Sequence, residues 1–286
     1  MEIIAQIIAN SLIAGSIYAL VALSFNLMYA TGKFFNLAIG GLIPIGGYTV
    51  LAVTVYLGLP VGVGILAGVV GTGIAGLLLD RLIYAPLRKR QASSLTLLIA
   101  SLGAFTFLQA ALALLFTSSY QTLPTLIDKN YSVFGAQVTA VQLILIISAV
   151  ACTLGMHILL RKTSFGTAVR AMSDDLEVSK IIGIDTEKIF CAVFFIAGAI
   201  LGYVGVLVGF DVGLDPLMGF FYMVAGIVGA IVGGMGEVLL GYPGSIIEGV
   251  LHNTIIYVYS AAWGSPITFV LIIIFLLFRP RGLFRK

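Results

Sequence analysis

Two carboxylates in otherwise apolar sequence are the side chains with the clearest chemical meaning. Glu248 lies in "YPGSIIEGVL", and Glu237 lies eleven residues earlier. A carboxylate is costly to bury unless water or a partner solvates it. We therefore expect Glu248 to line a hydrated pathway.

The remaining reactive residue types do not form a catalytic pattern. Cys152 and Cys191 lie within apolar runs and have no metal-ligand spacing, so we interpret them as small buried hydrophobes. His157 and His252 are isolated and fit packing or interfacial roles. "YATGKF" lacks the first glycine of a phosphate-binding loop. Enzyme activity is not expected, and if ATP drives this protein, another chain must hydrolyse it.

Two glycine-rich segments are candidates for a pathway through the protein. Pro44 in "NLAIGGLIPIGGY" frees backbone groups that need partners, which is tolerated where helices break around a cavity. Close helix packing is the alternative, and Gly229 and Gly233 in "AGIVGAIVGGMG" have the spacing for it. The candidate pathway residues are Asn36, Gly40, Gly41, Gly229, Gly233, Gly234 and Glu248.

Composition places all of these residues in a membrane protein. The 286 residues are 60% hydrophobic and only 9% charged, with a mean hydropathy of +1.14. Soluble domains carry about 25% charged residues. The N-terminus lacks the basic region and cleavage site of a secretory signal, so it is expected to be a retained first span.

Apolar runs predict an all-α, polytopic fold with eight or nine transmembrane helices, in a single domain covering residues 1–286. The last two runs are short and could be partly re-entrant. The predicted spans are 8–30, 34–57, 61–84, 95–117, 138–160, 189–210, 220–239, 244–260 and 264–279.

Basic residues set the predicted orientation. In this scheme 14 of the 15 Lys and Arg residues fall on one side, and only Lys129 falls on the other. The positive-inside rule makes the basic side cytoplasmic, with the N-terminus outside and the C-terminus inside. Asp80 lies near the cytoplasmic end of its span, where Arg81 is the expected partner.

A weak internal repeat relates the first two spans to the sixth and seventh. "LIAGSIYALVALSFNLMYATGKFFNLAIGGL" and "FIAGAILGYVGVLVGFDVGLDPLMGFFYMVAGI" both begin Ile-Ala-Gly, break, and resume with glycines. Because five spans separate the two copies, they would run in opposite directions. This is typical of inverted repeats in transporters.

The polar residues 161–188 form a charged loop between apolar runs. They carry 10 of the 27 charged side chains. Ser173 is the expected cap of a helix of about ten residues that ends at Gly183. Val178, Ile181 and Ile182 would share one apolar face. The loop is either a solvated connector or a docking helix for a soluble subunit.

This loop resembles the cytoplasmic loop of permease subunits of branched-chain amino acid ABC importers. "NSLIAGSIYALVALSFNLMYATG", "LIYAPLRKR" and "RPRGLF" resemble three further parts of that family, so the resemblance covers essentially the whole chain. In the loop, the matching residues are Gly166, Ala168, Arg170, Ala171, Asp174, Asp175, Gly183 and Ile184.

The resemblance implies that the loop is a coupling helix that inserts into a cytoplasmic ATPase. The implied partners are two ABC ATPase subunits, a second homologous permease chain or a copy of this one, and an extracytoplasmic substrate-binding protein, all at the inner membrane. No cofactor is expected on this chain, since ATP and Mg²⁺ would bind the ATPases. The implied coupling residues are Gly166, Arg170, Ala171, Asp174, Asp175, Ile181, Ile182 and Gly183.

The implied cargo is a small polar solute, most simply a branched-chain or other hydrophobic amino acid. Two departures put the cargo in question: Ile39 stands where the family has His, and the region around Glu237 is longer than usual. An ion-coupled secondary transporter that uses Glu248 or Glu237 is one alternative. A passive channel for a neutral solute such as urea or an amide is the other.

Overall fold

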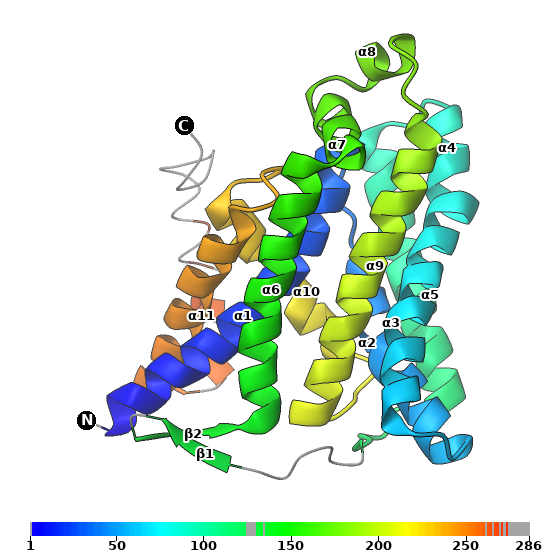
Figure 1. Cartoon of the computed structure of the whole chain (residues 1–286). Coiled ribbons are helices and arrows are strands. Elements are labelled where there is room, and N and C mark those ends of the chain that lie inside the picture. Colours follow the sequence, from blue (N-terminus) through cyan, green and yellow to red (C-terminus); the bar gives the residue numbers. More distant parts are fainter. Residues whose placement is uncertain are drawn as a thin grey trace. The chain divides into compact units, whose positions relative to one another are not determined.

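The computed structural model describes residues 2–123, 130–133, 135–260, 262–264, 266–268, 270 and 273. Helices dominate it (Figure 1). The elements are α1 (Glu2–Gly32), α2 (Ile39–Leu51), the π-helical turn η1 (Ala52–Tyr56), α3 (Val61–Leu79), the π-helical turn η2 (Asp80–Tyr84), α4 (Ala85–Lys89), α5 (Ser94–Phe116), β1 (Asn130–Val133), β2 (Ala136–Thr139), α6 (Ala140–Lys162), α7 (Ser164–Asp174), α8 (Leu176–Ile181), α9 (Thr186–Asp211), α10 (Met218–Gly233) and α11 (Gly241–Val258).

Six helices in the described part of the chain are long and apolar enough to cross a membrane. They match the first six predicted spans, so the all-helical, polytopic class is confirmed. α10 and α11 correspond to the seventh and eighth predicted spans. The ninth, at 264–279, lies mostly outside the described residues. The six helices cover Ile3–Gly32, Ile39–Tyr56, Val61–Lys89, Ser94–Phe116, Ala140–Lys162 and Thr186–Asp211.

Several predicted boundaries were wrong. The second span was predicted from residue 34, but residues 33–38 are not helical. The seventh was predicted to reach 239, but α10 ends at Gly233, because Gly234 and Gly236 take positive φ angles of 129° and 82°. The loop before α6 also holds an antiparallel hairpin of β1 and β2, so helix begins at Ala140 rather than 138.

The chain forms two compact units. The first contains Met1–Asn26, Ile127–Gly155 and Val224–Lys286, and the second contains Leu27–Leu126 and Met156–Met223. The single domain expected from the sequence stays a prediction.

Glycine contacts bring three helices of the second unit together. α2 packs against α9 where Gly46 lies over the backbone of Gly202, and where Gly205 lies over Ile43. Gly68 of α3 lies over the carbonyl of Gly46. Small residues allow such close backbone approach between membrane helices. Most residues of α2 and α9 are buried, whereas fewer than a third of those in α3 and α5 are buried.

The two stretches paired by the predicted repeat break in the same way. Six residues, 33–38, separate α1 from α2, and six residues, 212–217, separate α9 from α10. In each break the fourth residue uses its Oδ1 to accept a hydrogen bond from the backbone N–H two residues later. Asn36 does so at 3.1 Å and Asp215 at 2.7 Å. These side chains satisfy backbone donors that the broken helix leaves free.

Helix contacts follow the same correspondence. Gly40 and Gly219, each four residues after the Asn or Asp, pack directly against one another. Gly47 of α2 lies against Gly205 of α9, and Gly226, the counterpart of Gly47, packs in a similar way against α1. These matches support the predicted repeat.

Replacing Gly205 with alanine should destabilise the purified protein. The new Cβ would lie 1.8 Å from the carbonyl oxygen of Ile43, so α2 would have to move. Overpacking of this kind costs about 1–3 kcal/mol. Thermal unfolding in detergent measures the effect.

Gly71→Ala in α3 is the matched control, since nothing lies within 4 Å of its added Cβ. It should leave the stability unchanged or raise it by up to about 1 kcal/mol, because alanine favours helix over glycine. Equal stability of the two variants would contradict the packing described here.

Candidate functional site

The charged loop forms two helices instead of the one that was predicted. Thr163 caps α7 by accepting from the N–H of Gly166 at 3.1 Å. Asp175 caps α8 by accepting from the N–H groups of Glu177 and Val178 at 2.8 and 3.0 Å. The predicted cap, Ser173, was wrong, because this residue lies within α7. The expected helix is therefore shorter, at six residues.

The predicted end of that helix is confirmed. Gly183 has a φ of +88°, and its N–H donates to the carbonyl of Lys180 at 3.1 Å. The N–H of Ile184 donates to the carbonyl of Ser179 at 3.0 Å. Together these bonds form a Schellman motif, which requires a left-handed residue at the position of Gly183.

Three of the family-implied coupling residues contact the chain itself. A Cβ on Gly166 would lie 2.2 Å from the carbonyl oxygen of Leu160 in the last turn of α6. The Arg170 guanidinium donates to that same carbonyl, and to Thr167 Oγ1 at 3.3 Å. The carbonyl of Ala171 accepts from the N–H of Asp175 at 3.0 Å. They hold α7 against α6 and set where α8 begins, whereas Asp174 is exposed at the end of α7.

Apolar side chains of the α8 turn are open to solvent in the described structure. Val178, Ile181 and Ile182 are 50%, 83% and 65% exposed. We call these three residues the α8 patch. Ser179 is buried, so the helix turns its apolar side outward. Such a patch on a short helix is typical of a surface that another protein covers.

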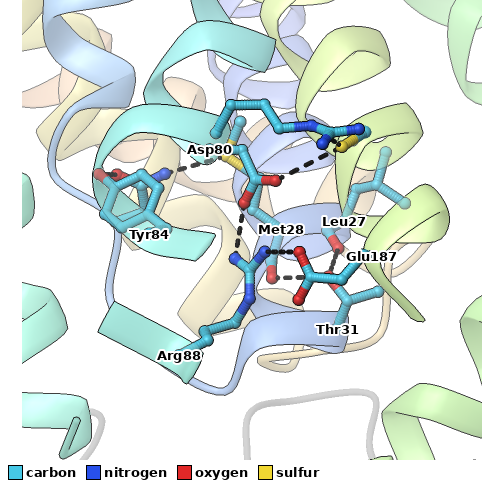
Figure 2. Close-up of polar contacts among 10 residues, drawn as sticks. Leu27, Met28, Thr31, Asp80, Tyr84, Arg88 and Glu187 are labelled. Atoms are coloured by element: carbon cyan, nitrogen blue, oxygen red, sulfur yellow. Dashed lines mark hydrogen bonds and ion pairs between the residues drawn. The ribbon is translucent and has the colours of Figure 1, made fainter. Parts of the chain in front are cut away.

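A buried ion-pair network lies where the loop returns to the membrane helices (Figure 2). Arg88 Nη1 contacts Asp80 Oδ1 at 2.6 Å, and its Nη2 contacts Glu187 Oε2 at 3.5 Å. The guanidinium also stacks on the ring of Phe190 at 3.8 Å. Asp80 is completely buried, and the Arg88 side chain is 10% exposed. The network ties η2 and α4 to the first turns of α9.

The expected pairing of Asp80 with Arg81 was wrong. Arg81 Nε donates to Cys191 Sγ at 3.0 Å instead. η2 is a π-helical turn, which changes the direction of successive side chains and brings Arg88 to Asp80. The Cys191 thiol also lies 3.8 Å from Asp80 Oδ2.

Asp185, near the end of the loop, caps α9. It accepts from the N–H of Lys188 at 3.2 Å, and its carboxylate pairs with the Lys188 ammonium at 2.8 Å. The side-chain hydrogen bond from Lys188 is the main cause that holds the pKa of Asp185 below its ordinary value. The loop is therefore fixed at both ends, by Thr163 and by Asp185.

Asn36 anchors the first helix break. It is buried, and its Oδ1 accepts from the Tyr84 hydroxyl at 2.8 Å, while its Nδ2 lies 3.2 Å from Met28 Sδ. Gly40 packs against Phe105 of α5 as well as Gly219, and Gly41 packs against Leu108 of α5. Close packing, one of the two interpretations, therefore describes both glycines.

The other pathway candidates lie in the first unit. A Cβ on Gly229 would lie 2.1 Å from Ser245 Oγ, and one on Gly233 would lie 2.0 Å from the carbonyl of Leu240. Gly234 ends α10 with its left-handed φ. These three glycines serve the contact of α10 with α11.

Glu248 of α11 is 3% exposed, so it does not face lipid. Its Oε2 has no hydrogen-bond partner among the described residues, and the same holds for Ser16 Oγ and Ser245 Oγ. α1 and α11 touch along this stretch, where Gly249 packs on Gly15. Unpaired buried polar atoms in a native structure call for water or a solute.

Comparisons with known proteins place this arrangement in a family. The model for "Branched-chain amino acid transport system / permease component" matches residues 7–276. The chain belongs to this permease family.

Two bacterial relatives and one archaeal relative match over nearly their whole length. The permease is 28% identical to the high-affinity branched-chain amino acid transport system permease protein BraD of Pseudomonas aeruginosa, over 97% of this chain and 94% of the relative. It is 28% identical to LivH of Escherichia coli K12, over 96% and 93%. It is 27% identical to the probable LivH of Methanocaldococcus jannaschii, over 97% and 91%. No solved structure gives a significant match.

Membership makes the chain the permease component of an ABC transport system and a multi-pass membrane protein. Permeases of this family lack ATPase activity and a cofactor of their own, and they work with ATPase and binding-protein partners. The family assignment therefore replaces the two alternatives considered from the sequence, a secondary transporter and a passive channel.

Asp80→Asn should destabilise the permease strongly. The substitution leaves the buried Arg88 without its closest partner. Breaking a buried pair on one side costs about 3–5 kcal/mol. Thermal unfolding in detergent measures the loss.

Glu177→Gln is the control, because it breaks the exposed pair with Lys180, whose side chains are 82% and 51% exposed. It should change the stability by no more than about 0.5 kcal/mol. A similar, small effect of both substitutions would show that the network does not hold η2 to α9.

Proposed function

We propose that the permease carries branched-chain or other hydrophobic amino acids into the cytoplasm of a cell, across its inner membrane. Two ABC ATPase subunits would drive transport, with a second permease chain or a copy of this one completing the membrane part. A substrate-binding protein would deliver the cargo. The names of BraD and LivH support the cargo, since both are branched-chain amino acid permeases matched over nearly all of this chain.

The α8 patch is the observation that carries the coupling role. Three apolar side chains, Val178, Ile181 and Ile182, stand exposed on a helix that Gly183 terminates rigidly. A six-residue helix has little stability of its own, so a partner groove that buries this face would complete it. An ATPase subunit is the partner that the family supplies.

Rigid connections make the loop suited to transmit movement. Gly166 and Arg170 fasten α7 to α6, and Asp185 caps α9. Arg88 then links Glu187, in the first turn of α9, to Asp80, the first residue of η2. A displacement of α8 would reach the membrane helices as a movement of whole elements.

Glu248 is proposed as a pathway residue in the first unit. It is buried from lipid, and its Oε2 has no hydrogen-bond partner in the part of the chain that the structure describes. Ser245, three residues earlier on α11, also has a hydroxyl with no partner among the described residues, so this face of α11 suits contact with water or a polar cargo.

Orientation is proposed from the distribution of charge within the second unit. Lys33, just after the end of α1, contacts Ser173 of α7, and Arg88 contacts Glu187. The basic residues of α4 and of the charged loop thus gather at one end of this unit. By the positive-inside rule that end is cytoplasmic, and the N-terminus is outside. Asp211 and Asp215 would then lie outside.

Ile182→Asp should release the ATPase subunits. It places a charge on the face that the partner must bury, at a cost of about 1–3 kcal/mol or more. Affinity should fall about tenfold or more. Pull-down of the ATPases and substrate-stimulated ATP hydrolysis on the purified complex measure this.

Ile182→Leu is the matched control, because it keeps the apolar face and should retain both signals. Membrane insertion and assembly with the second permease should survive both changes. Bound ATPases and normal hydrolysis with Ile182→Asp would show that α8 is not the transmission element.

Val212→Cys tests the orientation. Val212 is 55% exposed in the break between α9 and α10, whereas Leu214 is buried and unsuited to labelling. In a background lacking Cys152 and Cys191, the new thiol should react with an impermeant reagent in spheroplasts. Labelling that appears only after lysis would reverse the proposed topology.

A further inference from the structure

The second unit contains an apolar cavity of about 320 Å³ between α2 and α5. Ile45, Leu108, Ala111 and Leu112 form much of its wall. The ring of Phe116 packs against the ring of Tyr48, with centroids 4.8 Å apart. The volume falls at the lower end of pockets that hold small molecules. Leu115 also lines the cavity and is 75% exposed, so the cavity reaches the surface there.

One polar group in the wall lacks a partner. Tyr48 is 1% exposed, and its hydroxyl has no hydrogen-bond partner among the described residues. A buried hydroxyl without a partner is costly. Ligand sites commonly combine apolar walls with a small number of polar groups of this kind.

A carboxylate lies in the same neighbourhood. Asp215 lies in the break before α10, and the residue before it, Leu214, packs against Gly47, the neighbour of Tyr48 in α2. Its Oδ1 accepts a hydrogen bond from the N–H of Leu217 at 2.7 Å. The cavity also lies toward the end of α5 that is farthest from the basic residues of α4.

We propose that this cavity binds a hydrophobic amino acid in transit, with the aliphatic side chain against α5. The Tyr48 hydroxyl donates to the carboxylate of the amino acid, and Asp215 attracts its ammonium group. This inference rests on the proposed import of hydrophobic amino acids. In the proposed orientation the cavity faces the side from which a binding protein releases cargo.

A free amino acid suits the cavity better than a lipid chain does. An acyl chain would fill the apolar walls but leave the Tyr48 hydroxyl unpaired. A zwitterion with an aliphatic side chain satisfies the hydroxyl and the walls together. Each buried methylene strengthens binding about fourfold, so the site would prefer leucine to alanine.

Selection of cargo by the size of the cavity can be tested by ATP-driven uptake of radiolabelled leucine and alanine into proteoliposomes that hold the full complex. Ala111→Phe fills the cavity, so leucine uptake should fall at least about tenfold relative to alanine uptake. Ala110→Phe is the matched control, since Ala110 is the preceding residue of α5, is exposed and does not line the cavity. The control should keep the wild-type ratio.

Tyr48→Phe tests the hydroxyl without changing the shape of the cavity. The KM for leucine should rise about tenfold, as expected when a hydrogen bond to a charged group is lost. Thermal stability should stay equal or rise, because an unpaired buried hydroxyl is removed. If Tyr48 only fills space, stability would behave in the same way but the KM would not move.

The outcomes separate this inference from the proposed function. Wild-type complex that imports neither amino acid would overturn the proposed function. Wild-type import with the same leucine-to-alanine ratio in Ala111→Phe and Ala110→Phe, and an unchanged KM in Tyr48→Phe, would overturn the cavity alone. Loss of a co-purified lipid from Ala111→Phe at constant selectivity would assign the cavity to lipid and also overturn the inference.

Discussion

Close contact between the backbones of α2 and α9 is the constraint on which the second unit depends. Gly46, Gly202 and Gly205 leave no room for a Cβ at the contact, so these helices have a single fitting arrangement. α9 begins at the charged loop, and α2 carries Tyr48. The same contact therefore fixes the element that receives the loop and the element that shapes the cavity.

In this fold, polar side chains supply the hydrogen bonds and opposite charges that groups in a soluble protein receive from water and dissolved ions. Asn36 and Asp215 each satisfy a backbone donor at a helix break, and Arg88 neutralises Asp80 where solvent has no access. Because bilayer lipid offers no hydrogen bonds, breaks and charges persist only where such partners exist. Glu248 Oε2 and the Tyr48 hydroxyl are among the buried polar atoms without a partner in the described part of the chain, and these two are expected to meet cargo or water.

The sequence was sufficient for the long helices and for the end of α8, because apolar run length and a glycine after a helix are local signals. The sequence did not predict the structure correctly where two local signals competed. Ser173 and Asp175 are both good caps, and only the fold selects Asp175. α7 was missed, although Val169 and Met172, both buried, show the three-residue spacing of an amphipathic helix. The cavity was not visible at all, since it depends on α2 and α5 lying together.

The π-helical turn η2 also has an evolutionary consequence. In an α-helix, side chains four residues apart point in slightly different directions around the helix axis. The wider π turn offsets this rotation. Asp80, Tyr84 and Arg88 therefore all face the interior. A π turn arises when one residue is inserted into an α-helix. A descendant that lost this extra residue would rotate its basic turn away from Asp80, and it would have to move the arginine by one position or give up the buried acid. The extra residue of the π turn and the ion pair therefore depend on one another.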